Sequence, residues 1–180
     1  MARRLATLIA WATLVLTAWP ALAADLAEYQ VKAAFIYNFA RYVEWPPEAL
    51  GGRDAPFNVC IVGQDPFGAA FAAVEGRVVS GRPLRVRREV RPEEAAGCQI
   101  AFFADSEERR FLSELRILGS APVLTISDIE GFAEAGGAIG LFVADNRLQF
   151  DANFATLQRA SLKASSKALR LARTVYGMKR

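Results

Sequence analysis

Apolar runs of strand length alternate with helix-like segments along most of this chain, and this alternation constrains the fold more than any other feature. The runs "FNVCIVG", "QIAFFAD" and "APVLTIS" are apolar almost throughout, as expected for strands buried on both faces of a sheet. Segments such as "DPFGAAFAAVEG" separate them and are short helix candidates. The order predicts a single-domain α/β sandwich with a mainly parallel, Rossmann-like or flavodoxin-like sheet and helices on both faces.

Two further segments carry clear periodic signals. "RPLRVRREV" alternates apolar and charged residues, which predicts a half-exposed strand near an edge of the sheet, where the arginines discourage further pairing. "SEERRFLSELRILG" predicts an amphipathic helix that Ser106 caps and Gly119 ends. The residues expected on its apolar face are Phe111, Leu112, Leu115 and Leu118.

The C-terminal part predicts a hairpin followed by a helix. Strands over residues 138–144 and 147–151 flank the pair Asp145-Asn146, whose side chains suit a tight antiparallel turn. A long helix is then expected from Asn153 to about Thr174.

The first 23 residues have the layout of a secretory signal peptide. Arg3 and Arg4 precede an apolar stretch, and Ala21-Leu22-Ala23 supplies the small-x-small pattern that signal peptidase needs. The apolar run is shorter than the ~20 residues that span a bilayer, although an uncleaved anchor is the alternative. We therefore expect a signal peptide over residues 1–23 and one exported domain over residues 24–180.

Cleavage changes the charge balance of the protein. The full chain has 22 basic and 19 acidic side chains, and the leader removes two arginines, so 20 basic side chains remain against 19 acidic ones. This near neutrality argues against nucleic acid as a partner. The basic run from Arg82 to Arg91 is better explained as a charged edge strand, with binding of phosphate or anionic lipid as the alternative.

Residues for catalysis are scarce. The chain has no histidine, which removes the commonest general base and metal ligand. Asp65 and Asp105 fall at the carboxyl ends of predicted strands, where α/β sheets place ligands, but no partner base accompanies them. The pairs Glu93-Glu94 and Glu107-Glu108 are expected to face solvent. We therefore expect no enzyme activity, no metal and no cofactor.

Two cysteines, Cys60 and Cys98, remain in the exported chain. An even number of cysteines in an exported protein favours a disulfide, with two buried free thiols as the alternative. Cys60 lies in the first sheet strand and Cys98 immediately precedes "QIAFFAD", and a flavodoxin-type order makes these strands neighbours. Adjacent strands lie about 4.8 Å apart, within the Cα separation of about 4.4–6.8 Å that a disulfide tolerates.

The first helix, expected from about Leu26 to Val43, has aromatic side chains on more than one side. One face is expected to pack on the sheet, while a flanking face either lies deep in the core or contacts a second copy or another partner. The packed face comprises Val31, Phe35, Asn38, Phe39 and Tyr42. The candidate dimer or partner residues on the flanking face are Ile36, Tyr37 and Val43.

The junction "RLQFDANFATL" offers polar candidates for contact with a partner or ligand. Arg147, Gln149 and Asp151 share one side of a strand, opposite Leu148 and Phe150. Asn153 stands where a helix N-cap would, and capping is its simpler role.

Taken in order, several segments resemble the YfiR family of periplasmic regulators. These segments are "VKAAFIYNFARYVEWP", "FNVCIVGQDPFG", "SGRPLRVRRE", "CQIAFFAD", "PVLTISDIEGFAEAGGAIGLF" and "RLQFDANFATLQRASLKASSKALRLAR". The resemblance covers essentially the whole mature chain. It implies a protein that restrains a membrane-bound diguanylate cyclase by binding its periplasmic sensor region, until redox stress or capture by an outer-membrane partner lifts the restraint.

The resemblance also implies homodimers with disulfides, and Cys60 and Cys98 match one family pair. A second pair found in some relatives would fall in "EGFAEAGGAIGLF", where this chain has no cysteine. The alternative function, from the residues alone, is a periplasmic small-molecule sensor with its pocket at the strand ends.

Overall fold

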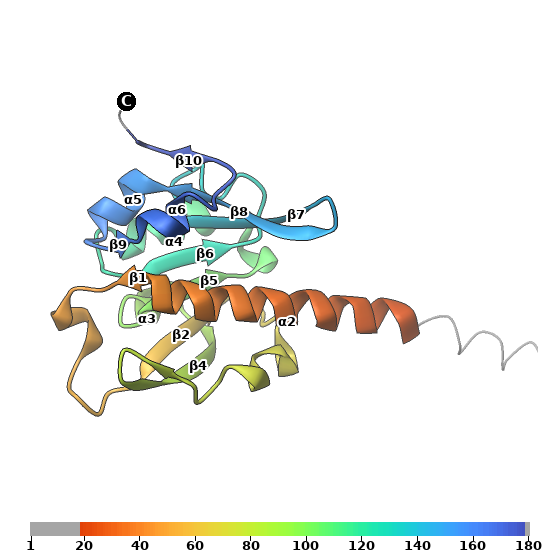
Figure 1. Cartoon of the computed structure of the whole chain (residues 1–180), viewed down its shortest axis with the longest axis horizontal. Helices are drawn as coiled ribbons and strands as arrows, with labels where there is room; N and C mark the ends of the chain where they lie inside the picture. Colours follow the sequence, from red (N-terminus) through yellow and green to blue (C-terminus); the bar gives the residue numbers. More distant parts are fainter. Residues whose placement is uncertain (1–18, 179–180) are drawn as a thin grey trace, which may run out of the picture.

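Eight strands form one sheet in the order β10-β8-β7-β6-β5-β2-β4-β3 in a computed structural model that describes residues 19–178, with side chains described from residue 26 onward (Figure 1). The five consecutive strands from β4 to β7 run parallel, and β8 then pairs antiparallel with β7. The strands are β2 (Phe57–Val62), β3 (Val78–Val79), β4 (Arg82–Val90), β5 (Ile100–Phe103), β6 (Leu124–Ser127), β7 (Ile139–Ala144), β8 (Arg147–Asn153) and β10 (Val175–Tyr176).

This strand order is that of a flavodoxin-like doubly wound sheet, because the chain starts in the middle of the sheet, steps to β4 and then returns past β2 to β5. The predicted α/β class and mainly parallel sheet are therefore confirmed. The point at which the direction of winding reverses lies between β2 and β5, and ligands of such folds bind outside the carboxyl ends of the strands at this point.

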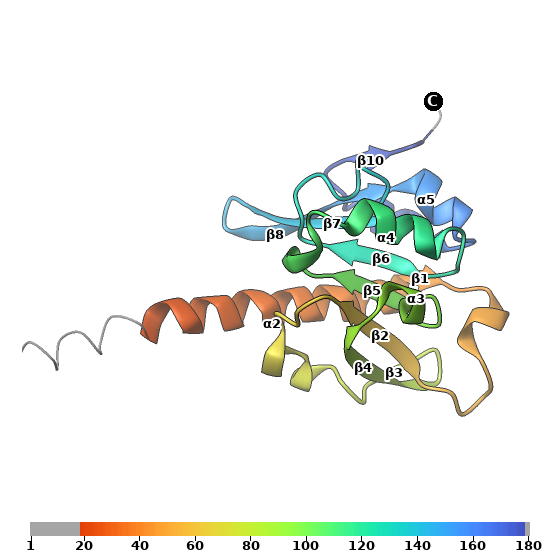
Figure 2. The same ribbon diagram turned by 180° about the vertical axis from the view of Figure 1, so that it is seen from behind.

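Helices cover both faces of the sheet, and each face buries its own apolar cluster. The long helix α2 (Trp19–Tyr42) crosses one face together with η2 (Gly68–Ala73), and α3 (Pro92–Ala95) and α4 (Phe111–Leu118) cover the other (Figures 1 and 2). Along β2 the side chains alternate: Val59 and Ile61 belong to the α2 cluster, whereas Cys60 and Val62 belong to the α4 cluster. The predicted leader, residues 1–23, lies mostly outside the described residues, and its cleavage stays a prediction.

The edges of the sheet follow the local sequence signals. Only the first two residues of β4 pair with the short β3, so most of the arginine-rich strand forms the edge, as predicted. β7 and β8 form the predicted hairpin, and Asp145 and Asn146 have φ angles of 51° and 57°. A two-residue hairpin turn in which both central residues have positive φ is a type I′ turn.

The predicted long C-terminal helix is wrong. Four short elements replace it: α5 (Phe154–Arg159), β9 (Lys163–Ala164), α6 (Ser166–Leu169) and β10. Helix α5 ends at Arg159, and Ser161 has a φ of 56°, which turns the chain away from the helical path. Strand β9 pairs with β1 (Val43–Glu44) directly after α2. Tertiary pairing at both β9 and β10 has therefore overridden the helical propensity of this segment.

The predicted helix over residues 106–118 is also shorter than expected. Residues Asp105–Glu107 form the separate 3-10 turn η3, and α4 begins only at Phe111. Ser106 does not cap α4, because its Oγ accepts a hydrogen bond from the Gln64 N–H at 3.0 Å. Leu112, predicted on the apolar face, is exposed.

Candidate functional site

Cys60 and Cys98 form the predicted disulfide, with their Cα atoms 6.1 Å apart. Both residues are buried, and β2 and β5 are neighbours as the expected order requires. The bond lies in the cluster under α3 and α4 and joins the middle of β2 to the residue two positions before β5. Its burial fits a structural bond.

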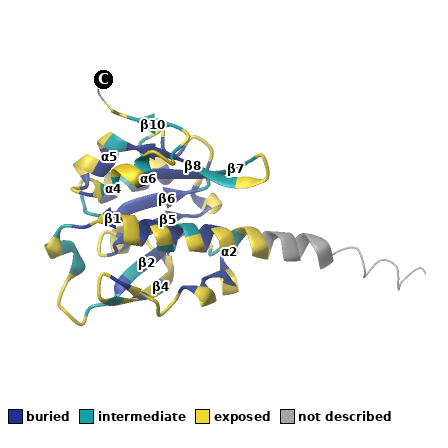
Figure 3. Cartoon of the chain, in the orientation of Figure 1, coloured by how far each residue is buried: buried dark blue, intermediate teal, exposed yellow. Residues whose placement is uncertain are grey.

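The expected division of α2 into a packed face and a free face is wrong. The side chains that contact the sheet come from Lys32, Ala33, Ile36, Phe39 and Ala40, all of which are buried. Ile36 and Val43, two of the candidate partner residues, are 0% and 5% exposed and belong to the core, while Tyr37 is half-buried. Conversely Val31, Asn38 and Tyr42, expected in the core, are exposed (Figure 3).

Lys32 explains part of this rotation of the helix. Its ammonium group lies 2.5 Å from Asp128 Oδ2, beyond the end of β6, and 2.6 Å from Glu28 Oε1 on the preceding turn of α2. Burial alone lowers the pKa of Lys32, but the hydrogen bonds to Asp128 and Glu28 outweigh it and raise the pKa. The buried pair fixes which side of α2 faces the sheet.

The hairpin extends the apolar surface of α2. Phe39 stacks on Phe150 of β8, and Phe35 stacks on Phe39, one turn closer to the N-terminus. Leu148 is on the same face of β8 as Phe150, and Val143 is its direct partner on β7. We use the name hairpin strip for four partly or fully exposed apolar residues that continue outward from this contact on the two elements: Val31, Phe35, Val143 and Leu148.

The polar candidates at the hairpin occupy different environments. Arg147 is exposed near the tip, and Gln149 is half-buried and donates to the Ala144 carbonyl at 3.4 Å. Asp151, expected to point outward, is buried and accepts from Arg173 Nη2 at 2.7 Å and from the Thr174 N–H at 3.0 Å. The guanidinium carbon of Arg173 lies over the Phe142 ring, 3.8 Å from the ring centroid. Asp151 therefore anchors the C-terminal segment.

Asn153 has the predicted capping role. Its side-chain oxygen accepts from the Thr156 N–H at 3.0 Å, which caps α5. Its amide nitrogen donates to the Ala133 carbonyl at 2.8 Å, and the residue is buried. Both polar ends of this side chain are therefore used inside the protein.

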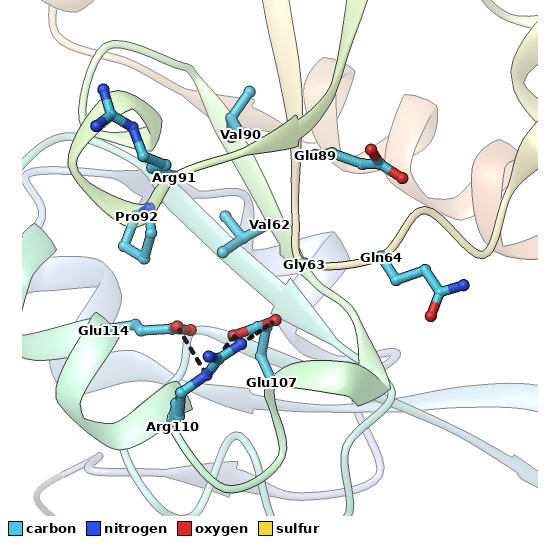
Figure 4. A pocket seen from close by; sticks show the side chains of 10 residues that line it. All are labelled: Val62, Gly63, Gln64, Glu89, Val90, Arg91, Pro92, Glu107, Arg110 and Glu114. Atoms are coloured by element: carbon cyan, nitrogen blue, oxygen red, sulfur yellow. Dashed lines mark hydrogen bonds and ion pairs between the residues drawn. The ribbon is translucent and has the colours of Figure 1, made fainter.

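A crevice lies where the fold type predicts a ligand site. It has a volume of about 470 Å³ and is bounded by the carboxyl ends of β2 and β4 and by the segment after β5 (Figure 4). A bulge deforms β4 at its rim, where Glu89 has a φ of 52°. The residues that line the crevice are Val62, Gly63, Gln64, Glu89, Val90, Arg91, Pro92, Glu107, Arg110 and Glu114.

Two carboxylates sit together on one side of this crevice. Glu107 and Glu114 are only 4% and 6% exposed, so the expectation that Glu107 faces solvent is wrong. Arg110 Nη2 lies 2.7 Å from Glu107 Oε2, and its Nε lies 3.9 Å from Glu114 Oε1 (Figure 4). The Glu114 Oε2 atom is buried and has no hydrogen-bond partner within the described part of the chain.

The two carboxyl groups have opposite pKa shifts. Burial, followed by the hydrogen bond with Glu107 and the repulsion of its charge, raises the pKa of Glu114 to about 7. Burial also opposes ionisation of Glu107, but hydrogen bonds from Glu114, Arg110 and Ser106 outweigh it and lower the pKa of Glu107. At pH values below about 7, one carboxylic acid beside one carboxylate is therefore the favoured state.

The sequence contained a signal for this pair that the pattern analysis missed. Glu114 follows Phe111 by three residues and precedes Leu118 by four, which places a carboxylate within the apolar stripe of α4. Asp65 and Asp105, selected instead for their positions after strands, have other surroundings: Asp65 pairs with Arg88 and accepts from the Phe67 N–H at 2.9 Å, and Asp105 is exposed.

Two further observations concern membranes and metals. Between residues 19 and 178, no helix is long and apolar enough to cross a membrane. The same residues contain no group of three or more cysteine, aspartate or glutamate side chains arranged to hold a metal ion.

The structure is thus a doubly wound α/β domain with one buried disulfide. The chain belongs to the YfiR/HmsC-like family, whose sequence profile matches residues 29–173.

Two solved structures align with this chain at low sequence identity. A conserved domain protein from Vibrio cholerae O1 biovar eltor str. N16961 aligns with a TM-score of 0.50 and 8% identity, over 66% of this chain and 54% of that chain. The ABC domain in complex with L-Trp from Streptococcus pneumonia aligns with a TM-score of 0.47 and 9% identity, over the same fractions, 66% and 54%. The chain thus spans about half the length of these proteins, and the first likeness concerns the fold alone.

Proposed function

We propose that the mature chain is a periplasmic regulatory binding protein that represses a membrane-bound diguanylate cyclase by binding the periplasmic sensor region of that enzyme. Membership of the YfiR/HmsC-like family supports a regulatory role. Cyclic-di-GMP synthesis then stays low while the complex persists, and capture by an outer-membrane partner releases it.

The observation that carries this proposal is the hairpin strip. Val143 and Val31 are 53% and 47% exposed, and both lie on elements that extend from the body of the protein in the same direction (Figures 1 and 3). Exposed apolar side chains beside polar ones such as Arg147 are typical of protein interaction surfaces. The strip therefore supports contact with another protein, the sensor region of the cyclase in this proposal.

The decisive experiment measures cyclic-di-GMP in a deletion strain complemented with variants of the chain. Wild-type protein should lower the cyclic-di-GMP level, and Val143→Asp should leave it near the level of the deletion strain, because a charge in the strip is costly to bury against a partner. Ile117→Asp is the matched control: Ile117 is 50% exposed but lies on α4, on the opposite face of the sheet.

A pull-down from membranes with the mature domain separates loss of binding from loss of folding. Wild-type protein and Ile117→Asp should capture the cyclase, and Val143→Asp should not, while all three give the same circular dichroism spectrum. Full repression by a folded Val143→Asp variant would exclude the hairpin strip as the contact. An unchanged cyclic-di-GMP level after deletion of the chain would exclude the regulatory role itself.

A second candidate function is a periplasmic small-molecule sensor, which the crevice of about 470 Å³ at the winding reversal favours. Native mass spectrometry of the protein purified from the periplasm tests it. A stoichiometric small molecule that is lost after changes in the crevice, but not after Val143→Asp, would support the sensor function over the hairpin-strip proposal.

A further inference from the structure

The carboxyl pair in the crevice presents a chemical problem that the fold must solve. Glu107 and Glu114 are buried side by side, and a single guanidinium, that of Arg110, faces both (Figure 4). Arg110 forms its short contacts with Glu107, which leaves the buried Glu114 Oε2 without a donor. Two ionised carboxylates in this place would repel each other, and a buried acceptor without a donor is costly.

One proton solves both problems. A protonated Glu114 donates a hydrogen bond to Glu107, which removes one negative charge and uses the polar atom that otherwise has no partner. We propose that Glu107 and Glu114 hold one proton between them in the folded protein at weakly acidic pH, lose it as the pH rises through neutrality, and so act as a proton-linked latch on the turn that follows β2.

Hydrogen bonds connect the Glu107–Glu114 pair to the turn after β2, and these bonds form the latch. Ser106 Oγ donates to Glu107 Oε1 at 3.1 Å and accepts from the Gln64 N–H at 3.0 Å, so the turn after β2 is tied to the Glu107 carboxylate. Gly63 in this turn leaves space for the contact, because a Cβ at that position would collide with Ser106 and Glu107. Loss of the proton makes the two carboxylates repel, which displaces Glu107 and weakens the hold on Gln64.

The charges around the pair come from three segments. Arg110 favours ionisation of Glu114, whereas Glu107 on η3 and Glu93 on α3 oppose it. Glu89 on β4 and Arg91 just after it also line the crevice, but their charged ends point away from the carboxyl pair (Figure 4). The chain has no histidine, so the side chain that ordinarily titrates between pH 5 and 8 is missing. The titration of a glutamate between pH 5 and 8 is therefore easy to detect.

The direct test follows the glutamate side-chain carboxyl carbons of the mature protein by NMR between pH 4 and 9. The Glu114 carboxyl should titrate with a midpoint of about 7, and this transition should be missing in Glu114→Gln. Glu108→Gln is the control: Glu108 is exposed beside Glu107, and its replacement should leave the transition in place. A Glu114 midpoint below pH 5 would overturn the shared proton.

The latch has its own readout at the Gln64 amide. Its chemical shift and hydrogen exchange should change with the same midpoint as the Glu114 carboxyl, and the change should be lost in Glu114→Gln. A Gln64 amide that does not respond to pH while Glu114 titrates would overturn the latch.

Stability gives a third, independent measurement. The folded-state pKa of Glu114 is raised from its ordinary value near 4.5 to about 7, so the folded state binds more protons than the unfolded state between these values. The stabilisation is complete below the lower value and is lost as the pH rises to 7. The folding equilibrium constant should fall by up to about tenfold per pH unit in this window. Glu114→Gln should flatten this dependence of stability on pH. Glu107→Gln should move the dependence to lower pH, because the charge of Glu107 helps to raise the pKa of Glu114. The same slope in wild type and Glu114→Gln would contradict the proposal.

Discussion

Phe39 of α2 and Phe150 of β8 stack edge to face, with ring centroids 5.0 Å apart and an interplanar angle of 87°. Both rings are buried, and they join the N-terminal helix to the C-terminal hairpin. The hairpin strip continues outward from this contact on both elements. The stack of the two rings therefore holds the α2 part and the hairpin part of the strip next to each other. Helix and hairpin are distant in sequence, so the surface exists only in the folded chain.

Replacement of this stack should destabilise the whole domain. Phe39→Ala should lower the free energy of unfolding by about 3–5 kcal/mol, because it removes a buried ring and leaves a cavity. Urea denaturation measures this loss. Tyr42→Ala, one turn further along α2 but exposed, should change it by less than about 0.5 kcal/mol. Equal losses in the two variants would contradict the assigned orientation of α2.

The disulfide should supply a large part of the stability. The two cysteines are 38 residues apart, and closing a loop of this length contributes about 4 kcal/mol on the chain-entropy model. The double replacement Cys60→Ala, Cys98→Ala should therefore lose a large share of the ~5–15 kcal/mol typical of a domain. Mass spectrometry of the non-reduced protein provides the direct check, and two thiols that react with an alkylating agent after denaturation would show that the bond is absent.

Two glycines with similar backbone angles should respond differently to alanine. Gly63 has a φ of 84° and Gly81 a φ of 78°, so alanine is strained at both positions. A Cβ at Gly63 would also collide with Ser106 and Glu107, whereas a Cβ at Gly81 has open space. Gly63→Ala should cost more than the roughly 1–2 kcal/mol expected for Gly81→Ala in thermal or urea unfolding. An equal cost would mean that the turn after β2 is not tightly packed.

Asp151 and Arg147 should separate stability from partner contact. Asp151→Ala removes the acceptor of Arg173 and of the Thr174 N–H, and should lower the free energy of unfolding by roughly 1–3 kcal/mol. Arg147→Ala alters an exposed side chain and should leave stability within about 0.5 kcal/mol. If Arg147→Ala represses cyclic-di-GMP synthesis as well as wild type does, Arg147 is not part of the contact.

A homodimer remains a prediction for the mature chain. Light scattering at micromolar concentration should give about twice the monomer mass. Val31→Asp changes an exposed position of the hairpin strip and should shift the protein toward monomer if copies meet through this strip. A wild-type monomer would refute the dimer, and a stable Val31→Asp dimer would place the dimer contact elsewhere.

The sequence by itself determined the central strands of the sheet, the hairpin and the bond between the cysteines. Strands buried on both faces must be apolar at nearly every position, so "QIAFFAD" can be recognised without knowledge of its neighbours. Asp145 and Asn146 indicate their turn for an equally local reason, since their side chains tolerate positive φ. The pairing of Cys60 with Cys98 followed from strand order, which the alternating pattern already restricts.

Only the tertiary structure decided which side of α2 is buried and what becomes of the C-terminal segment. The helix has apolar side chains on all sides, so periodicity could not select a face, and the ion pair of Lys32 with Asp128, 96 residues away, helped to select it. Residues 163–164 left the helical path because β1 supplied a strand partner. Asp151 is buried because Arg173 pairs with it. Glu114 is buried because α4 packs on the sheet beside Glu107. Burial of a charge depends on distant partners, and local sequence patterns do not contain that information.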